Sequence, residues 1–267
     1  RALSKVCILG SLYASNALYA YGATHGAAGG TSRRVLVAPG QPDSLRAQRG
    51  CLAPRIIDMY AGVDGCPKGW VALVLPDERI VEGFQQLAGL LEALNGCEVI
   101  AVDMPLNAPE TGQRPCDLSV RAELGPFASS LFMTPTAQAL AAATQEEASR
   151  INIERGGYGV TSQAFSLRNK IAEVAELQRP DLVEVHPELV FRLLGPVIHR
   201  KRSWAGLRER VEVLQTHGLH PQSWDCGNWA EADDTMDAAA AALTARRYAR
   251  GEALRFPPEG QDPAIFA

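Results

Sequence analysis

Long apolar runs and paired cysteines are both missing from this sequence of 267 residues. No apolar stretch reaches the roughly 18 residues that a membrane-spanning helix needs, which argues against an integral membrane protein and predicts no membrane partner. The six cysteines are scattered, without a Cys-x-x-Cys pair or a Cys/His cluster at zinc-ligand spacing. This pattern is typical of reduced thiols, so we expect a cytoplasmic protein.

Three catalytic signatures are missing as well. The sequence has no glycine-rich phosphate loop, no nucleotide-binding fingerprint and no signature of a cysteine or histidine nucleophile. The composition is otherwise that of an ordinary globular protein, with 46% hydrophobic and 21% charged residues. These absences leave the acidic residues described below without a competing site.

Charge is unevenly distributed along the chain. Residues 1–58 hold seven Lys/Arg against two acids, a net charge of +5, whereas the remainder holds 19 against 28, a net charge of −9. The first segment is rich in Ser, Ala, Gly and Arg and shows no persistent period. We interpret residues 1–58 as a disordered or non-native N-terminal extension, with a signal or transit peptide as the alternative. Residues 59–267 are predicted to form a single domain that begins at Met59.

The stretch from Tyr60 to Leu75 is the first with a clear pattern. It consists of a short apolar strand, an Asp at the end of that strand, a Gly/Pro turn and a second strand. An ionised carboxylate taken from water costs several kcal/mol unless it is paired or bound to a cation, so Asp64 is a candidate metal ligand. The alternative is that Asp64 caps its own turn, and this stretch alone favours neither.

A second carboxylate ends a second buried strand. After a third strand and a helix, the run 99–105 reads as a continuous apolar strand that leads into Asp103. A strand-helix-strand order predicts a parallel crossover, which places the two strands side by side. Two independent turn caps would not explain Asp64 and Asp103 at the same end of neighbouring strands, so we favour a shared site.

Residues 106–180 are predicted to be mostly helical, with an Ala-rich helix over 137–150 and a long amphipathic helix capped by Ser162. Asp117 and Arg121 are spaced i, i+4, which is typical of a surface pair of small energetic value.

A third apolar strand is predicted over 181–188. Alternation places Glu184, His186 and Glu188 on one side of it. A lone His is more often structural than functional, but three polar side chains at the end of a strand indicate a site. The later run His199–Arg202 is basic, and it is where an anionic polymer would be held if one binds.

The last helix of the sequence begins with acids. Asp234 and Asp237 are three residues apart, so they share a face within the first turns. Asp233 is a candidate cap, and acids are favoured by the helix dipole at this end. Together with Asp64 and Asp103 they form a set of carboxylates that would repel one another unless cations lie among them. Oxygen ligands of this kind select hard ions such as Mg²⁺ or Mn²⁺.

The order of the elements resembles the ribonuclease H-like fold of the RuvC type. That is an α/β fold of three layers, in which a mixed five-stranded sheet, three antiparallel strands and then parallel ones, is flanked by helices, here with a helical insertion. Several motifs make a closer resemblance possible: Gly62-Val63-Asp64-Gly65-Cys66 with Gly69-Trp70, Val102-Asp103-Met104-Pro105-Leu106, Cys116-Asp117 with Arg121, Ser162-Gln163-Ala164-Phe165, Lys170-Ile171, Glu184-Val185-His186-Pro187-Glu188 and Asp233-Asp234 with Asp237-Ala238. Through these motifs, the chain from about residue 60 to 265 resembles the family called domain of unknown function 429, described as predicted nucleases of that fold.

The resemblance implies a nuclease that hydrolyses phosphodiester bonds with two Mg²⁺ or Mn²⁺ ions about 4 Å apart. It implies metal ligation by Asp64, Asp103 and Asp237, with Asp234 as a fourth catalytic acid. The residues it implies for substrate contacts are Glu184, His186, Lys170, Arg121 and Lys201, although Lys170 taken alone reads as a solvated helix lysine. The acidic balance of the domain disfavours tight nonspecific DNA binding, so we expect a small or structured nucleic acid or another phosphodiester.

Two other functions fit the same sequence. One is an ATP-dependent phosphotransferase of the actin and sugar-kinase superfamily, which shares the fold and also begins with an Asp-Gly turn. Such enzymes usually need two domains of this kind and a Thr/Ser-rich phosphate turn, which this chain lacks. The other is a non-catalytic protein that keeps the ribonuclease H-like fold for binding or regulation.

Overall fold

The computed structural model describes residues 58–177, 179–260 and 262–267. The predicted N-terminal extension, apart from residue 58, lies outside the described residues. Among the helices of the described part, none combines the length and the apolar character that a membrane crossing requires.

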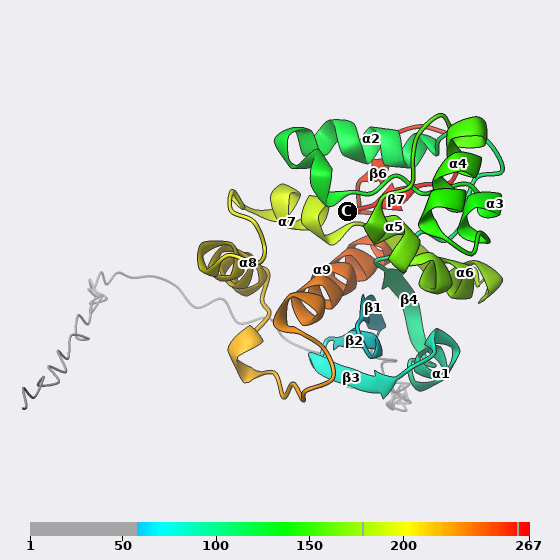
Figure 1. Cartoon of the computed structure of the whole chain (residues 1–267). Coiled ribbons are helices and arrows are strands. Elements are labelled where there is room, and N and C mark those ends of the chain that lie inside the picture. Colours follow the sequence, from blue (N-terminus) through cyan, green and yellow to red (C-terminus); the bar gives the residue numbers. More distant parts are fainter. Residues whose placement is uncertain (1–57, 178, 261) are drawn as a thin grey trace, which may run out of the picture. The chain divides into compact units, whose positions relative to one another are not determined.

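The described residues form an α/β structure around one mixed sheet, whose strand order is β3-β2-β1-β4-β5-β7-β6 (Figure 1). Its strands are β1 (Met59–Cys66), β2 (Gly69–Leu75), β3 (Arg79–Phe84), β4 (Cys97–Val102), β5 (Leu182–Val185), β6 (Arg255–Phe256) and β7 (Ile265–Phe266). The first three are antiparallel neighbours, and β1, β4, β5 and β7 run parallel. The predicted number of five strands was wrong, because β6 and β7 extend the sheet to seven. With two residues each, they are too short to show an alternating pattern.

Nine α-helices and two 3₁₀ helices occur in the described part of the chain. They are α1 (Leu87–Ala93), α2 (Pro115–Leu124), η1 (Gly125–Ser130), α3 (Ala137–Leu140), α4 (Gln145–Gly156), α5 (Ser162–Ser166), α6 (Arg168–Leu177), α7 (Pro187–Leu194), α8 (Trp204–Thr216), η2 (Pro221–Ser223) and α9 (Ala232–Ala249). The predicted insertion is present as the helices α2 to α6 between β4 and β5.

Three local predictions need correction. The helix expected over 137–150 is divided into α3 and α4, because Thr144 is an N-cap whose side chain accepts a hydrogen bond from the Glu147 N–H. The amphipathic helix is divided into α5 and α6, and Thr161 caps it in place of Ser162. The third apolar strand is shorter than predicted, because α7 begins at Pro187.

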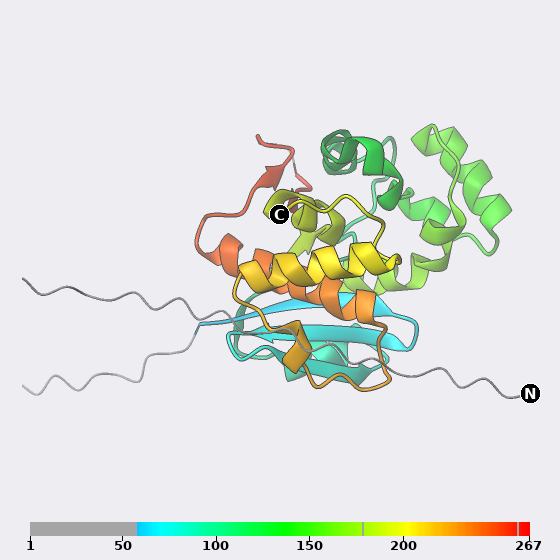
Figure 2. The same ribbon diagram turned by 90° about the vertical axis from the view of Figure 1, so that its left-hand side faces the viewer.

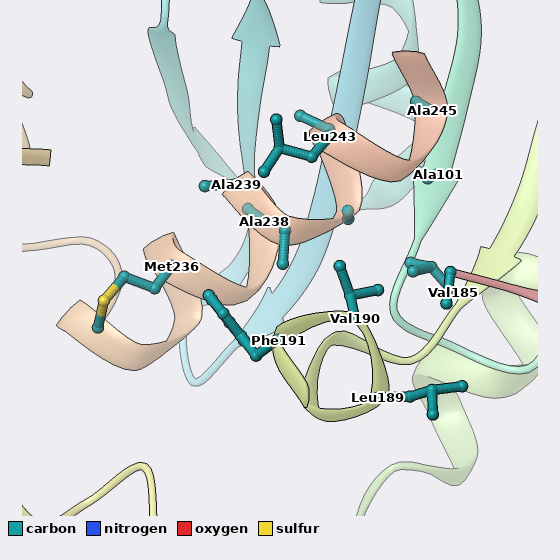
Figure 3. Close-up of a cluster of buried hydrophobic side chains, with 14 of the residues drawn as sticks. Ala101, Val185, Leu189, Val190, Phe191, Met236, Ala238, Ala239, Leu243 and Ala245 are labelled. Carbon is teal, nitrogen blue, oxygen red and sulfur yellow. The ribbon is translucent and has the colours of Figure 1, made fainter. Parts of the chain in front are cut away.

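Helices cover both faces of the sheet. On one face, the apolar side chains of β1, β2 and β4 pack with α1 and α6. On the other face, they pack with α7, α8 and α9. Figure 2 shows α8 and α9, in yellow and orange, on the same side of the blue and cyan strands. Figure 3 shows how the side chains of α7 and α9, among them Phe191, Val190 and Met236, meet in this second core.

Helix α9 lies directly on β1 because both elements have small residues where they touch. A Cβ atom on Gly62 would lie only 2.0 Å from the Ala238 carbonyl oxygen and from the Ala242 backbone nitrogen. A side chain at position 62 would therefore push the helix away. The alanine run of α9 is fully buried, as expected for a helix that approaches a sheet closely.

Candidate metal centre

Three carboxylates meet where the carboxyl ends of β1 and β4 adjoin α9. Side chains alternate along a strand, so Asp64, two residues after Gly62, points to the α9 face. Asp103 directly follows β4, and its backbone N–H donates to the Val63 carbonyl at 2.9 Å. Asp237 immediately precedes Ala238 at the point of closest approach of the helix. One oxygen from each of these three carboxylates lies within 4.8 Å of the other two.

The surroundings of this carboxylate triad raise the pKa values of its members. Burial raises the pKa of Asp64 well above its usual range, and the negative charges of Asp103 and Asp237 add to the effect. Burial and the neighbouring Asp237 raise the pKa of Asp103 to about 8. Burial likewise raises the pKa of Asp237 to about 6, against the opposing charge of Lys201. Without a cation, the triad therefore holds protons at neutral pH.

Lys201 supplies the positive charge nearest to the triad. Its Nζ donates to Asp237 Oδ2 at 2.5 Å and lies 3.7 Å from Asp233 Oδ2. Burial opposes the charged form, but the attraction of Asp237 raises the pKa of this lysine, so it stays protonated. One ammonium thus faces three carboxyl groups, which leaves the triad with too little positive charge for all three to be ionised.

Asp234 lies beside the triad rather than in it. Its Oδ2 accepts a hydrogen bond of 3.0 Å from the Glu231 N–H and so caps α9. The expectation that Asp233 is the cap is therefore wrong, because Glu231 occupies the N-cap position. Asp234 shares with the triad the lining of the adjoining cleft.

A cleft of about 1250 Å³ opens over the triad. Eight of the nine predicted site residues line it: Asp64, Asp103, Lys170, Glu184, His186, Lys201, Asp234 and Asp237. The same cleft is bordered by residues that no sequence motif indicated, including Ser166 from α5 and Arg114, the residue before α2. The volume is larger than the 300 to 1000 Å³ that is typical of small-molecule pockets.

Arg121 is the exception. It lines a separate pocket of about 340 Å³, together with Gln113, Tyr158 and others. Leu131 and Phe132 border both the pocket and the cleft, so the two hollows are neighbours.

The carboxylate of Glu184 already binds another side chain of the protein. Glu184 pairs with Val102 in the parallel register of β4 and β5, so the two side chains point to the same face of the sheet. This is the face covered by α1 and α6, opposite to the face of Asp103. Arg114 donates to both of its oxygens, at 2.5 and 2.9 Å, and also to Asp117 Oδ1. The remaining oxygen of Asp117 accepts from the Thr134 N–H at 2.9 Å. This buried ion cluster, defined as Arg114, Asp117 and Glu184, corrects the prediction of a surface pair between Asp117 and Arg121.

His186 and Lys170 also have protein partners. His186 caps α7, its Nδ1 accepting from the Leu189 N–H at 3.3 Å, and burial lowers its pKa to about 4. The imidazole is therefore neutral at pH 7. Lys170 Nζ donates to the Gly69 carbonyl and lies 4.3 Å from the centre of the Trp70 ring. Burial lowers the pKa of this lysine, so it is not the solvated helix lysine that its sequence context suggested.

A family model described as a protein of unknown function, DUF429, matches residues 62–262. The chain belongs to this family. A search of curated proteins and a search of solved structures each found no match.

The match to DUF429 covers all nine predicted site residues and ends before β7. Arg114 also lies within it, although sequence reasoning missed this residue. The signal that could have indicated Arg114 is weak, because a single Arg before a Pro at the start of a helix has no distinctive pattern. Its importance comes from two carboxylates, three and 70 residues away in sequence, which only the fold brings together.

The donor set of the triad fits a hard divalent cation. All three side chains offer carboxylate oxygens, and neither a thiol nor an imidazole belongs to the group. A second acidic group, Cys116 with Asp117 and Glu184, is also compact. That group fits a metal poorly, because Arg114 already neutralises its carboxylates and burial raises the pKa of the Cys116 thiol to about 12.

Proposed function

We propose that this protein is a metal-dependent nuclease of the ribonuclease H-like, RuvC-type fold that hydrolyses phosphodiester bonds with two Mg²⁺ or Mn²⁺ ions. The observation that supports this most strongly is the convergence of Asp64, Asp103 and Asp237, whose carboxylate oxygens lie within 4.8 Å of one another. Such a concentration of negative charge in a buried place is costly unless a cation binds there. A purely structural role would not need it.

The bound ions would activate a water molecule and stabilise the leaving oxygen. Asp64, Asp103 and Asp237 would hold them, each in the ionised state. Asp64 also accepts a hydrogen bond of 2.7 Å from the Gly65 N–H, which fixes its orientation. Asp234, already bound to the helix start, supplies further negative charge at the rim of the site.

The cleft provides the substrate contacts of this proposal. Lys201 would hold a phosphate oxygen, and Lys170 lines the same cleft close enough to Asp64 for the two charges to interact. His186 lines the same cleft, but its Nδ1 is occupied by the Leu189 N–H and burial lowers its pKa to about 4, so it would contact substrate as a neutral group rather than take up a proton. Glu184 would act through Arg114 rather than by touching substrate, and Arg121 would contact only a substrate that extends past Phe132. A cytoplasmic location fits the four free cysteines of the described part.

One observation favours a second function. Lys201 neutralises part of the triad without any metal, and a protein that had lost catalysis could keep its fold in this way. A non-catalytic binding protein of the same fold is therefore the second candidate. We find no comparable support for the phosphotransferase.

The test is cleavage of single-stranded, duplex, hybrid and branched nucleic acids by the full chain with Mg²⁺ or Mn²⁺. We expect cleavage that Asp64→Asn abolishes. Asp77→Asn is the matched control, because Asp77 lies in the β2–β3 turn with 62% of its side chain exposed. Cleavage that persists in Asp64→Asn would refute the proposal, and metal binding without cleavage of any substrate would favour the second candidate.

A further inference from the structure

Trp204 is an exposed tryptophan two residues beyond Arg202, which lines the cleft. It is the first residue of α8, and 79% of its surface is accessible. Trp70, by contrast, is fully buried, and Trp224 and Trp229 are partly buried. The exposed indole leaves a large aromatic face available for stacking.

Basic residues flank Trp204 in the sequence. The preceding residues Arg200, Lys201 and Arg202 line the cleft over the triad, and consecutive Cα atoms are about 3.8 Å apart, so Trp204 lies within about 8 Å of Arg202 along the chain. Arg208 is one turn further on the same face of α8. The side chains of Arg202 and Arg208 are 83% and 65% exposed, and their ion contacts within the described residues, to Asp233 and Glu212, are long, at 3.7 and 3.4 Å.

This basic rim, defined as Arg200, Lys201, Arg202, Trp204 and Arg208, is held firmly in place. Ser203 caps α8 and donates from its hydroxyl to the Arg200 carbonyl at 2.8 Å. A Cβ on Gly206 would lie 2.1 Å from that same carbonyl oxygen, so the rim packs against the first turn of the helix.

Beneath the rim, the buried Arg210 donates to the His199 and Gly206 carbonyls and pairs with Glu188 at 2.5 Å. The backbone that carries Trp204 is therefore fixed before any ligand arrives.

We propose that the basic rim binds single-stranded nucleic acid, with a base stacked on Trp204 and the adjacent phosphates held by Arg200 and Arg202. The inference rests on the proposed function, because it leads the strand into the cleft over the triad. A single strand offers both an unpaired aromatic face and a phosphate chain, whereas a duplex keeps its bases inside the stack. Residues 59–267 carry a net negative charge. A nucleic acid would therefore be attracted to the basic rim and repelled by the acidic remainder of the surface.

The test measures binding without cleavage. Full-length protein carrying Asp64→Asn is titrated in EDTA with fluorescein-labelled oligo(dT) or oligo(U), and anisotropy and tryptophan emission are recorded. We expect Trp204→Ala to weaken binding roughly 5-fold to 100-fold, Trp204→Phe to retain most of it, and a bound strand to quench tryptophan emission. Arg200→Gln with Arg202→Gln should lower the slope of log Kd against log salt by about 1.4.

Tyr248→Ala is the matched aromatic control. Tyr248 is 40% exposed and lies eleven residues beyond Asp237 on α9, about 16 Å along the helix, so its removal should leave binding unchanged. Equal affinity of Trp204→Ala and its parent, or tighter binding of duplex than of single strand, would overturn the proposal. So would binding of phosphatidylserine vesicles, but not oligonucleotides, that depends on Trp204. Because no cleavage is measured, failure of the nuclease assignment would leave this result standing, and the reverse also holds.

Discussion

Two buried groups of charges lie on the lining of one cleft, and they differ in how completely their charges are paired. In the ion cluster, Arg114 donates to Asp117 and Glu184, and the backbone N–H groups of Thr134 and Leu106 fill further acceptor sites. In the triad, three carboxyl groups meet, and within the described part of the chain the ammonium that bonds to them is that of Lys201.

This difference separates a structural role from a functional one. A cluster whose donors and acceptors are all satisfied fixes the segments that meet there, namely the start of α2, the end of β5 and the segment after β4. A cluster that is short of positive charge is under electrostatic tension, and only a further cation or proton relieves it. We therefore expect substitutions in the two groups to act on stability with opposite signs.

The largest effect is expected in the ion cluster. Arg114→Met leaves two buried carboxylates without their partner, which typically costs about 3–5 kcal/mol. The free energy of unfolding from urea titration, monitored by circular dichroism, would measure this loss. Arg179→Met is the matched control, since Arg179 pairs with Asp181 at a half-exposed position, and it should cost less than about 1 kcal/mol. Equal losses in the two variants would show that the ion cluster contributes no more to the free energy of unfolding than a half-exposed ion pair does.

Removal of a triad carboxylate should act in the opposite direction on stability. Asp103→Asn relieves repulsion, so the metal-free protein should become more stable, while cleavage should fall by a factor of roughly 10²–10³ or more. Thermal melts in EDTA and initial rates with Mn²⁺ give the two readouts. A destabilised metal-free variant would contradict the view that the triad is short of positive charge.

The pH dependence of stability tests the same idea without mutation. Burial raises the pKa of Asp103 to about 8 and that of Asp237 to about 6. Since the folded state holds these protons more tightly than the unfolded state, their contribution to stability is full at low pH and is lost as pH rises through those values. The lowered pKa of His186 has the reverse sign, but it acts only below about pH 6.5.

Between pH 6.5 and pH 8.5, the free energy of unfolding in EDTA should therefore fall by about 1–2 kcal/mol. Melts across this range measure the decrease, and Asp103→Asn should flatten it. Saturating Mn²⁺ should also flatten it, because the cation replaces the proton. A free energy of unfolding that rises over this pH range would contradict the raised pKa values of Asp103 and Asp237.

The sequence predicted the parts of the fold that repeat along the chain. Apolar strands that end in Asp64 and Asp103 indicated two parallel neighbours, and the structure places these strands side by side. The alanine run of α9 lies close to β1, where Gly62 has no side chain to hold the helix away. The short strands β6 and β7 were missed, because two residues have no period and their pairing depends on contacts distant in sequence.

For the site, a regular pattern was again the reliable guide. Asp237 was predicted to lie with Asp64 and Asp103, and its carboxylate does join the triad. Asp234, three residues earlier, instead caps the helix. Arg114 had no local pattern at all, and its partners come from other elements. Pairings between isolated polar residues are set by tertiary structure, so a single sequence does not contain them in readable form.

The smallest predicted effect concerns Lys201. It tests whether the ammonium of this lysine competes with a divalent cation for the triad. Lys201 occupies an oxygen of Asp237, so a divalent ion must compete with its ammonium. Lys201→Met should raise Mn²⁺ affinity about three- to tenfold, or roughly 0.6–1.4 kcal/mol, in calorimetric titrations of the full chain.

Arg202→Met is the matched control, since Arg202 contacts Asp233 but no member of the triad. The same Lys201→Met variant should bind substrate more weakly, because the displaced ammonium would otherwise reach a phosphate. Weaker metal binding in Lys201→Met would mean that the lysine supports the metal site instead of competing with it, and the triad would then resemble the fully paired cluster more than its charges suggest.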